Sequence, residues 1–525
     1  MNSIMKNISI KVLSLLLAMV LISSCKNYDE LVKNPNLPTA VPPNLLLHGV
    51  LNTMNNDPWS DAHIFNQFFN STYTYYGTNN YDQDPFFNTT SGFYYRTLEN
   101  VVRMEQEAKN SGAADVNPYS ALGKFFRAYF YNEMTQKYGD IPVTEALQGQ
   151  DNIRPKYDSQ KAVMMEILRL LDEANTDLAS LITAGNTTLA GDIYLGNDLR
   201  AWRKVVNTFT LRVLVSLSKK DTDTDLNVKS KFAAILGNAT QYPILTGNGD
   251  NLKYVYNAQF NNYPKTPGTI GFDIHRQNVG ATFLNLTTAL KDPRTFISST
   301  PAPAQLTAGK TVDDFAAYVG ASNGDDMGTL GANAQGGVYS YVNPRYYFDY
   351  AGSKAEPSLI IGYPELCFNV AEGINRGWAA GSAATWYTNG INASMEFFGL
   401  ADGVTLTITD KSYTVLGSVT VDVTTYLAQP SVAYAGDNAA GLQQILEQKY
   451  IAFWQNSGWQ AFYNYRRTGV PTFLTGSGTG NAGKIPTRWQ YPIGEAAANP
   501  VNYKAAVQEQ FNGTDDLNGK LWINQ

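Results

Sequence analysis

QKAVMMEILRLLDEANTDLASLI (residues 160–182) and LRAWRKVVNTFTLRVLVSLSK (residues 199–219) are the two stretches that decide the fold class. In the first, apolar side chains recur at helical spacing, at Val163, Ile167, Leu170, Leu171 and Leu178. In the second, the same spacing holds at Trp202, Val205, Val206, Phe209, Val213 and Leu217. This spacing places the apolar side chains on one face of each helix, and Ser159 supplies an N-cap for the first. The two stretches therefore predict a pair of packed helices.

Further helix pairs flank this one along the chain. The predicted helices are residues 101–109 with 118–139, 364–376 with 383–398, and 442–455 with 459–465. Helix-turn-helix units of about 30 to 40 residues are typical of tetratricopeptide-like packing. We therefore predict a mainly α-helical fold.

A long insertion, residues 221–361, separates the early pairs from the late ones. It is rich in Gly, Asn, Thr, Pro and Tyr and has weak helical periodicity. Loops of this length in a compact protein are usually functional. A smaller excursion, residues 404–426, alternates Val, Leu and Thr and predicts a short β-hairpin.

The N-terminus has the layout of a lipoprotein signal. Lys6 and Lys11 are followed by an apolar run of eleven residues from Val12 to Ile22, and residues 21–25, Leu-Ile-Ser-Ser-Cys, resemble a lipobox that ends at Cys25. The run is too short for a membrane-spanning helix, which needs about 20 residues. We predict a signal peptide at residues 1–24, a lipidated Cys25 with an extended tether at 25–44, and a single binding domain at 45–525; the alternative is an ordinary signal peptide with a chance cysteine.

Charge and cysteine content narrow the function classes. Removal of residues 1–24 takes away two lysines and moves the net charge from −6 to −8. A nucleic-acid partner is therefore not expected. Cys367 is the only other cysteine, and its neighbours Leu366, Phe368 and Val370 predict a buried thiol rather than a disulfide.

Short strings spread over nearly the whole chain resemble the SusD/RagB family of outer-membrane nutrient-binding lipoproteins. Early in the chain they are Asn34-Pro35-Asn36, residues 42–47 (PPNLLL) and residues 138–146 (YGDIPVTEA). In the middle they are residues 192–194 (DIY), Trp202, Asn207, Leu211-Arg212, Asp292-Pro293-Arg294 and Ala371-Glu372-Gly373. Later they are Gln448-Lys449, residues 466–469 (RRTG), Pro471, Ile485-Pro486, Arg488, Tyr491-Pro492, Glu495 and Asn499. Most of these residues are better explained as scaffold than as site.

The resemblance implies a SusD-like α-helical fold with four tetratricopeptide-like helix pairs, long loop insertions and small β-hairpins. It also implies a partner, a SusC-like TonB-dependent transporter that the lipoprotein caps as a lid. Acidic residues Asp29 and Glu30 after Cys25 resemble the export signal of Bacteroidetes surface lipoproteins. The expected location is the outer membrane, lipid-anchored, at the cell surface.

Aromatic residues are concentrated between Trp59 and Tyr95, with thirteen in 37 residues. Flat aromatic faces beside amide and carboxylate groups suit a sugar, which has both C–H faces and hydroxyls. The predicted ligand-binding residues are Tyr73, Tyr75, Tyr76, Asn80, Tyr81 and Asp82. The resemblance places part of the site in the insertion, so Tyr341, Arg345, Tyr346 and Tyr347 are second candidates. The alternative is that these aromatics belong to the core, as we expect for Phe65, Phe68, Phe69 and residues 93–95.

We therefore predict a protein that binds an oligosaccharide nutrient and is not an enzyme. The alternatives are a hydrolase acting on such a glycan, with Glu365 and Glu372 as its carboxylates, or a binder of peptides or another nutrient. Gly478, Gly480 and Gly483 only formally match a nucleotide-binding loop, because Pro486 follows and no strand precedes them. No cofactor is expected, although Asn323, Asp325 and Asp326 leave open a structural Ca²⁺.

Overall fold

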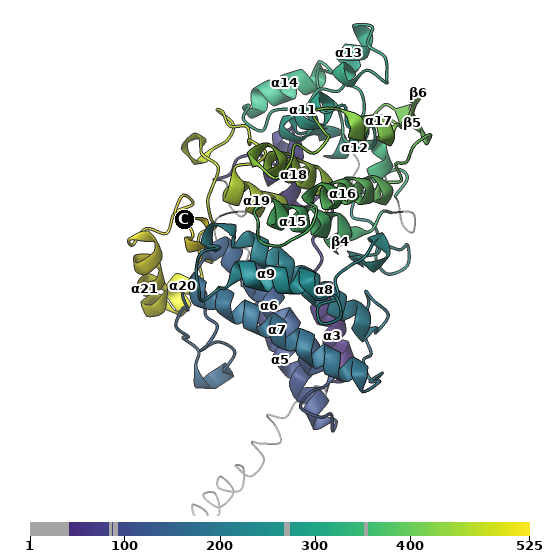
Figure 1. The fold of residues 1–525 in the computed structure, drawn as a ribbon. Coiled ribbons are helices and arrows are strands. Elements are labelled where there is room, and N and C mark those ends of the chain that lie inside the picture. The colour runs from purple at the N-terminus through teal and green to yellow at the C-terminus, as the bar shows by residue number, and fades with distance from the viewer. Residues whose placement is uncertain (1–40, 83–86, 88–92, 267–272, 351–354) are drawn as a thin grey trace, which may run out of the picture. The chain divides into compact units, whose positions relative to one another are not determined.

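Helices dominate the computed structural model, which describes residues 41–82, 87, 93–266, 273–350 and 355–525. In the first half of the chain they are α3 (Pro43–Asn52), α4 (Asp61–Phe65), α5 (Tyr95–Asn110), α6 (Pro118–Tyr138), α7 (Gln160–Thr183), α8 (Leu199–Ser216) and α9 (Val228–Gly237). In the second half they are α15 (Tyr363–Asn375), α16 (Ala383–Phe397), α17 (Val423–Ala428), α18 (Ala439–Ala452), α19 (Gln460–Thr468), α20 (Glu495–Ala498) and α21 (Pro500–Phe511). Figure 1 shows both groups. The prediction of a mainly α-helical fold is confirmed.

Local side-chain bonds set where the long helices begin. The Ser159 hydroxyl accepts a hydrogen bond from the Ala162 N–H and begins α7. The Asp198 carboxylate caps α8 in the same way, and Asn117 forms a capping box with Ser120 at the start of α6. These bonds satisfy N–H groups that the first turn of a helix otherwise leaves unpaired. The boundaries predicted from the sequence therefore hold closely at these starts.

Packing follows the predicted pairs, with one difference. Helix α5 packs on α6, α7 on α8 and α15 on α16, and α6 also packs on α7. Helix α18 instead packs mainly on α15, and α19 contacts α8. The chain turns sharply between α18 and α19 because Gln455, Ser457 and Gly458 all have positive φ. Helices α18 and α19 are therefore present as predicted, but instead of packing on each other, each contacts an earlier helix.

The insertion contains short elements that its sequence did not reveal. They are the 3₁₀ turns η4 (Asn248–Asp250), η5 (Asp273–Arg276), η6 (Phe315–Ala317) and η7 (Pro344–Tyr346), and the helices α11 (Ala281–Ala289), α12 (Arg294–Ser298), α13 (Pro303–Thr307) and α14 (Met327–Gln335). Most of the helices are too short for a periodic pattern to develop.

Three two-stranded antiparallel sheets complete the described fold. Strand β1 (Phe69–Ser71) pairs with β3 (Gln277–Val279), and β2 (Leu252–Tyr254) pairs with β4 (Ser358–Ile361). Strand β5 (Thr405–Thr409) pairs with β6 (Val415–Thr420), as the predicted hairpin requires. The β1–β3 pair fastens the insertion to an earlier part of the chain, whereas the β2–β4 pair joins two segments of the insertion itself.

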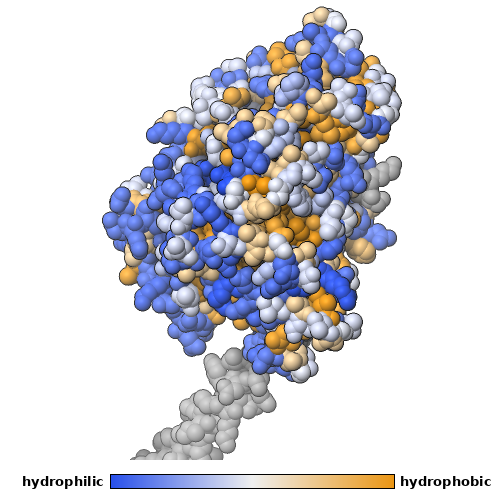
Figure 2. All heavy atoms as spheres, in the orientation of Figure 1, coloured by the Kyte–Doolittle hydropathy of each residue, from blue (hydrophilic) through white to orange (hydrophobic). Residues whose placement is uncertain are grey.

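Residues 43–525 form one compact unit with a large apolar core. Cys367 is fully buried in this unit, as predicted, and burial raises the pKa of its thiol to about 12. On the face drawn in Figure 2, hydrophilic and hydrophobic side chains are mixed. In the described part of the chain, every helix is too short or too polar to cross a membrane. Cys25, the signal peptide and the tether up to residue 40 lie outside the described residues.

Candidate ligand-binding surface

The pairing of β1 with β3 brings a tyrosine loop beside an arginine of the insertion. Just beyond the paired strands, the Thr72 N–H donates a hydrogen bond to the Arg276 carbonyl at 2.8 Å. The Thr72 hydroxyl donates to the same carbonyl at 2.9 Å. Arg276, which is half-buried, then extends over the ring of Tyr73, with 5.1 Å from its guanidinium carbon to the ring centre. The tyrosine loop and the insertion, which are distant in the sequence, therefore lie side by side where β1 and β3 end.

Tyr73 and Tyr75, which are exposed, and Tyr76, which is half-buried, form an aromatic cluster around the 3₁₀ turn η1 (Thr74–Tyr76). Tyr73 is 46% exposed and Tyr75 is 83% exposed. The ring centres of Tyr73 and Tyr76 lie 5.7 Å apart, and those of Tyr75 and Tyr76 lie 5.0 Å apart, edge to face. Exposed rings of this kind present both an apolar face and a phenol group to a ligand.

The glycine-rich segment 474–484 packs against the loop of residues 72–82 that carries these tyrosines. The Tyr81 N–H donates to the Thr479 carbonyl at 2.9 Å, and the Asn481 N–H donates to the Asp82 carboxylate at 2.6 Å. A Cβ atom on Gly480 would lie 1.6 Å from the Asn80 side-chain oxygen, so only glycine allows this approach. Asn80 and Asp82 therefore hold the loop in place.

A third loop packs against the same segment. The Gly478 N–H donates to the Gly324 carbonyl at 2.9 Å, and a Cβ atom on Gly478 would lie 1.8 Å from the Asp325 carbonyl oxygen. Two of the three glycines that formally match a nucleotide-binding loop, Gly478 and Gly480, thus serve the close packing of three loops, residues 72–82, 322–328 and 474–484.

Two predicted ligand-binding tyrosines lie in the core. Tyr81 and Tyr346 are each 1% exposed. The Tyr81 hydroxyl donates to the Phe65 carbonyl at 3.0 Å, and the ring of Tyr346 packs edge-on against Trp454. Side chains this deeply buried have no surface left for a ligand, so we leave both out of the proposed site.

The other candidates from the insertion are split between core and cavity wall. Tyr341 and Tyr347 are nearly buried. Arg345 forms an ion pair with Glu356 and lines a separate cavity beside the β5–β6 hairpin. The structure therefore brings Tyr73, Tyr75 and Tyr76 together, keeps Asn80 and Asp82 in the same loop, and places Arg345 at a separate cavity.

Comparison with known proteins identifies the family. Residues 35–492 match the SusD-like family described as starch-binding and associating with the outer membrane. This chain belongs to the SusD-like family. A SusD homologue from Bacteroides fragilis has 30% sequence identity and a TM-score of 0.79, with 92% of this chain and 100% of that chain covered. The resemblance seen in the sequence is thereby confirmed, and the family is one of nutrient- and glycan-binding outer-membrane proteins.

Two further solved structures share the SusD-like architecture. A chitin-binding protein has 25% identity and a TM-score of 0.68, with 92% of this chain and 99% of that chain covered. A chitin-binding SusD homologue from Flavobacterium johnsoniae has 19% identity and a TM-score of 0.70, with 92% and 98% covered, and shows the fold alone. A comparison with functionally curated proteins found no match.

The two carboxylates considered for hydrolysis are buried partners of arginines in this SusD-like chain. Glu365 accepts hydrogen bonds from Arg212, and Glu372 accepts from Arg467 and Arg376. Burial alone would raise the pKa of Glu372, but the neighbouring positive charges outweigh it and hold this pKa at about 2. A glycosidase acid needs a raised pKa and access to substrate, which is the opposite environment.

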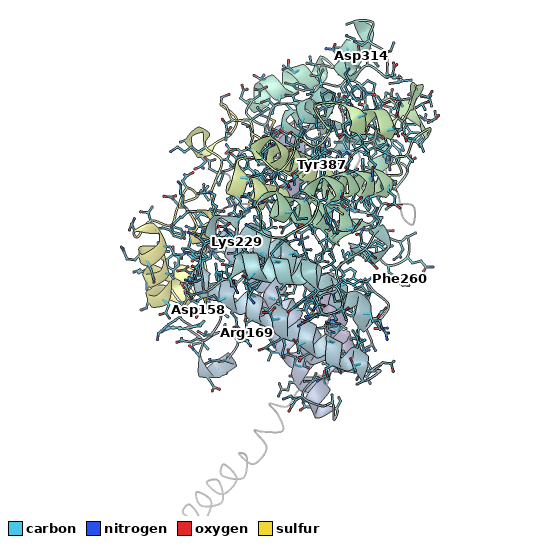
Figure 3. The ribbon with its side chains drawn as sticks, in the orientation of Figure 1. Asp158, Arg169, Lys229, Phe260, Asp314 and Tyr387 are labelled. Atoms are coloured by element: carbon cyan, nitrogen blue, oxygen red, sulfur yellow. The ribbon has the colours of Figure 1, made fainter. Side chains whose placement is uncertain are left out.

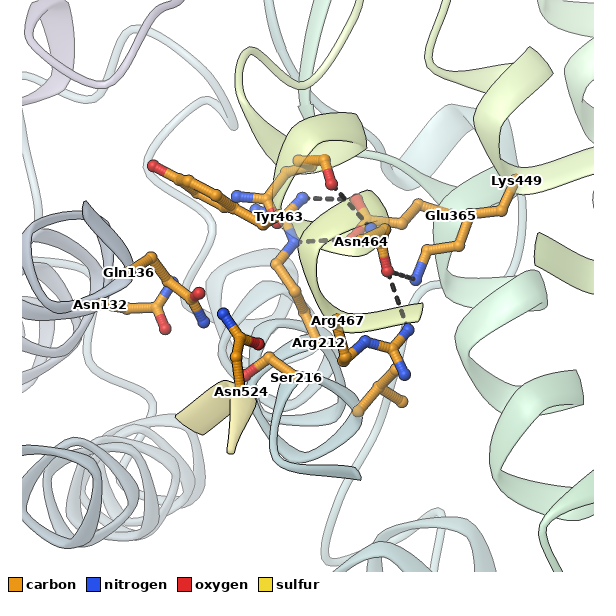
Figure 4. Close-up of a pocket in the computed structure, with 12 residues that line it drawn as sticks. Asn132, Gln136, Arg212, Ser216, Glu365, Lys449, Tyr463, Asn464, Arg467 and Asn524 are labelled. Atoms are coloured by element: carbon orange, nitrogen blue, oxygen red, sulfur yellow. Dashed lines mark hydrogen bonds and ion pairs between the residues drawn. The ribbon is translucent and has the colours of Figure 1, made fainter. Parts of the chain in front are cut away.

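The cavity beside these groups is small and polar. Figure 4 shows Arg212, Glu365, Lys449, Asn464 and Arg467 around it. Its volume of about 20 Å³ is that of a site for one water molecule. Burial lowers the pKa of Lys449 to about 8, and its ammonium donates to Asn369 and Asn464. We interpret the cluster as a structural network that joins α8, α15, α18 and α19.

The calcium site considered from the sequence gains no support from the geometry. The Asp326 carboxylate accepts hydrogen bonds from the backbone N–H and the hydroxyl of Thr329, and so caps α14. Among the described residues, no three His, Cys, Asp or Glu side chains lie together in a way that could hold a metal ion. A bound Ca²⁺ remains a prediction.

Arg276 is the functional candidate that sequence reasoning missed. It follows His275 in a segment without a regular pattern. Its place beside Tyr73 depends on strand pairing between residues about 200 positions apart, as the separation of 204 between Thr72 and Arg276 shows. Nothing in the local sequence of either segment indicates that pairing.

Proposed function

We propose that this SusD-like chain captures a neutral oligosaccharide at the cell surface through Tyr73, Tyr75, Tyr76 and Arg276. The tyrosine cluster, in which Tyr73 and Tyr75 are exposed, carries this proposal, because stacking on sugar C–H faces needs accessible rings. Asn80 and Asp82 lie in the same loop as these rings and offer polar groups for hydroxyls. The chitin-binding activity named for the relative at 25% identity makes chito-oligosaccharides a probe to include beside starch fragments.

We also propose how the captured ligand reaches the cell. Lipidation at Cys25 would anchor the protein to the outer membrane, and a SusC-like TonB-dependent transporter would receive the ligand. Family membership supports this arrangement. We further propose that the chain binds without catalysis, since the carboxylate pair considered for hydrolysis is already bonded to arginines.

A binding screen tests the capture function. The chain from Lys26 to Gln525 is examined by affinity electrophoresis and a glycan array that includes maltohexaose and chitohexaose, followed by product analysis. Retention without cleavage is the expected result. Cleaved product would favour the hydrolase, and retention of peptides alone would favour another nutrient.

Substitutions in the tyrosine cluster test whether the ligand binds there. Tyr75→Ala with Tyr76→Ala should weaken binding about tenfold or more, as expected for aromatic anchors. Phe260→Ala is the matched control, because Phe260 is 90% exposed and lies on a different loop at the edge of the molecule (Figure 3). Equal binding by all variants would move the site elsewhere.

A further inference from the structure

A second cavity lies between the end of the insertion and the β5–β6 hairpin. Its volume is about 450 Å³, within the range of small-molecule sites. Arg345, Asp349 and Tyr350 line it from the insertion, and Thr407, Thr409 and Tyr413 line it from the hairpin. Two segments separated in the sequence therefore enclose a space far larger than the water-sized cavity beside Glu365.

The hairpin wall carries hydroxyl groups on one face of β5. Side chains alternate along a strand, so Thr405 and Thr407 share one face, and the register shifts between Ile408 and Thr409. Ile408 points the other way and is 1% exposed, packed in the core. Thr405 and Thr407 are exposed, so their hydroxyls are open to solvent, whereas Thr409 is buried.

An aromatic ring is fixed at the tip of the same hairpin. Tyr413 has φ of 68°, a backbone region that bulky residues rarely adopt. Its hydroxyl donates to the Asp349 carboxylate, and its ring centre lies 5.3 Å from that of Phe348. The ring is still 43% exposed. A strained residue held by specific contacts and left open to solvent points to a binding role.

The charges around the cavity disfavour an anionic ligand. The Arg345 guanidinium is paired with Glu356, and it donates at 2.6 Å to the Tyr350 hydroxyl. This pairing neutralises the positive charge of Arg345, while Asp349 adds a negative one. Hydroxyls, an aromatic ring and a carboxylate acceptor together suit a neutral polyhydroxylated molecule.

Contacts connect this cavity to the tyrosine loop. The Tyr347 hydroxyl donates at 2.9 Å to the carbonyl of Lys411 in the hairpin turn. The ring of Tyr347 lies 6.2 Å from that of His275, the residue before Arg276. The hairpin is thus held against the same part of the insertion that carries Arg276.

We infer that the cavity beside the β5–β6 hairpin is a second carbohydrate subsite, which takes a neutral sugar unit against Tyr413 and Thr407. This inference rests on the proposed glycan-binding function. It assigns recognition to the hairpin, a part of the chain distinct from the tyrosine loop.

Saturation-transfer NMR with small sugars tests the subsite directly. The probes are glucose, galactose, N-acetylglucosamine, maltose and chitobiose, with glucuronic acid as the anionic comparison. Measurements use the chain from Lys26 to Gln525 carrying Tyr75→Ala and Tyr76→Ala, so that only the cavity remains. A neutral sugar should bind, and adding Tyr413→Ala should weaken that binding about fivefold or more.

Thr407→Val keeps the shape of an exposed side chain and removes only the hydroxyl, so it tests the subsite without loss of folding. It should also weaken binding, whereas Phe260→Ala should not. Binding unaffected by both hairpin variants, or binding of glucuronic acid alone, overturns the inference. Binding by the chain with intact tyrosines but not by the double variant overturns it and leaves the proposed function standing. Binding in the double variant that the hairpin variants weaken supports the inference. If the chain with intact tyrosines binds no more tightly than the double variant, the tyrosine loop is removed as a site while the subsite stands. Binding by neither chain overturns both proposals.

Discussion

The guanidinium of Arg276 lies over the ring of Tyr73, 5.1 Å from the ring centre. A cation above an aromatic face is attracted by the ring's quadrupole. The contact also fixes the ring beside Tyr76, whose centre is 5.7 Å away. The insertion thereby helps to position the tyrosine loop, which gives the first prediction.

Arg276→Gln should weaken glycan binding by about two- to fivefold, because it removes a cation–π contact worth about 0.5–1 kcal/mol at an exposed site. The affinity for the glycan identified by the screen is the measurement. Arg169→Gln is the control, since Arg169 pairs with Glu166 and Glu173 on the exposed face of α7 (Figure 3). An equal loss in both variants would show that charge alone, and not this contact, matters.

Gly478→Ala should disturb the support of the tyrosine loop. Its Cβ would lie 1.8 Å from the Asp325 carbonyl oxygen, so one of the two loops must move. We expect a loss of about 1–3 kcal/mol in the free energy of unfolding, measured in urea, and weaker glycan binding. Gly494→Ala is the control, because no atom lies within 4 Å of its Cβ position and its φ is −61°. Wild-type binding by Gly478→Ala would mean that the loops adjust freely.

The sequence predicted the helices well because their signals are local. Helix α7 runs from Gln160 to Thr183, against a predicted range of 160–182, since Ser159 caps it and the apolar spacing continues to its end. The β5–β6 hairpin was visible for a similar reason, an alternating pattern that ends at a turn. Local patterns of this kind survive without knowledge of tertiary contacts.

The binding surface was only partly predictable because burial depends on distant partners. Tyr75 and Tyr81 have similar polar neighbours in the sequence, yet one is 83% exposed and the other 1%. The ring of Tyr81 packs near Phe462, which lies almost 400 positions away. The same holds for Tyr346 and Trp454. Composition predicted an aromatic surface in a segment that does expose Tyr73 and Tyr75, but it could not tell which rings face solvent.

Glu372→Gln should lower the stability of the fold strongly near neutral pH. It leaves the buried Arg467 without its charged partner, a change that costs about 3–5 kcal/mol. The pKa of Glu372 is held at about 2, below its usual 4.5. Its contribution to the stability is therefore complete above pH 4.5 and is lost as the pH falls toward 2. Urea midpoints from pH 7 to 2 measure this.

The difference in urea midpoint between wild type and Glu372→Gln should shrink with acidification. Glu166→Gln is the control, because Glu166 lies on the surface of α7 and pairs only with an exposed arginine. It should change stability by less than about 1 kcal/mol at any pH. If the difference in urea midpoint between wild type and Glu372→Gln stays constant as the pH falls, the pH-dependent stability does not come from the ionised Glu372 carboxylate.

Asp140→Asn should change the pH dependence in the opposite direction. Burial raises the pKa of Asp140 from 3.8 to about 7, and its carboxyl oxygen accepts the Gln160 N–H at the start of α7. The folded state holds this proton more tightly than the unfolded state, so the stability it supplies is complete below pH 3.8 and is lost as the pH rises through 7. Asparagine keeps a hydrogen-bond acceptor and carries no charge. The variant should therefore lose less stability than wild type between pH 4 and 8, as measured by urea unfolding. If the free energy of unfolding changes with pH by the same amount in the two proteins, Asp140 is ionised in the folded state throughout this range.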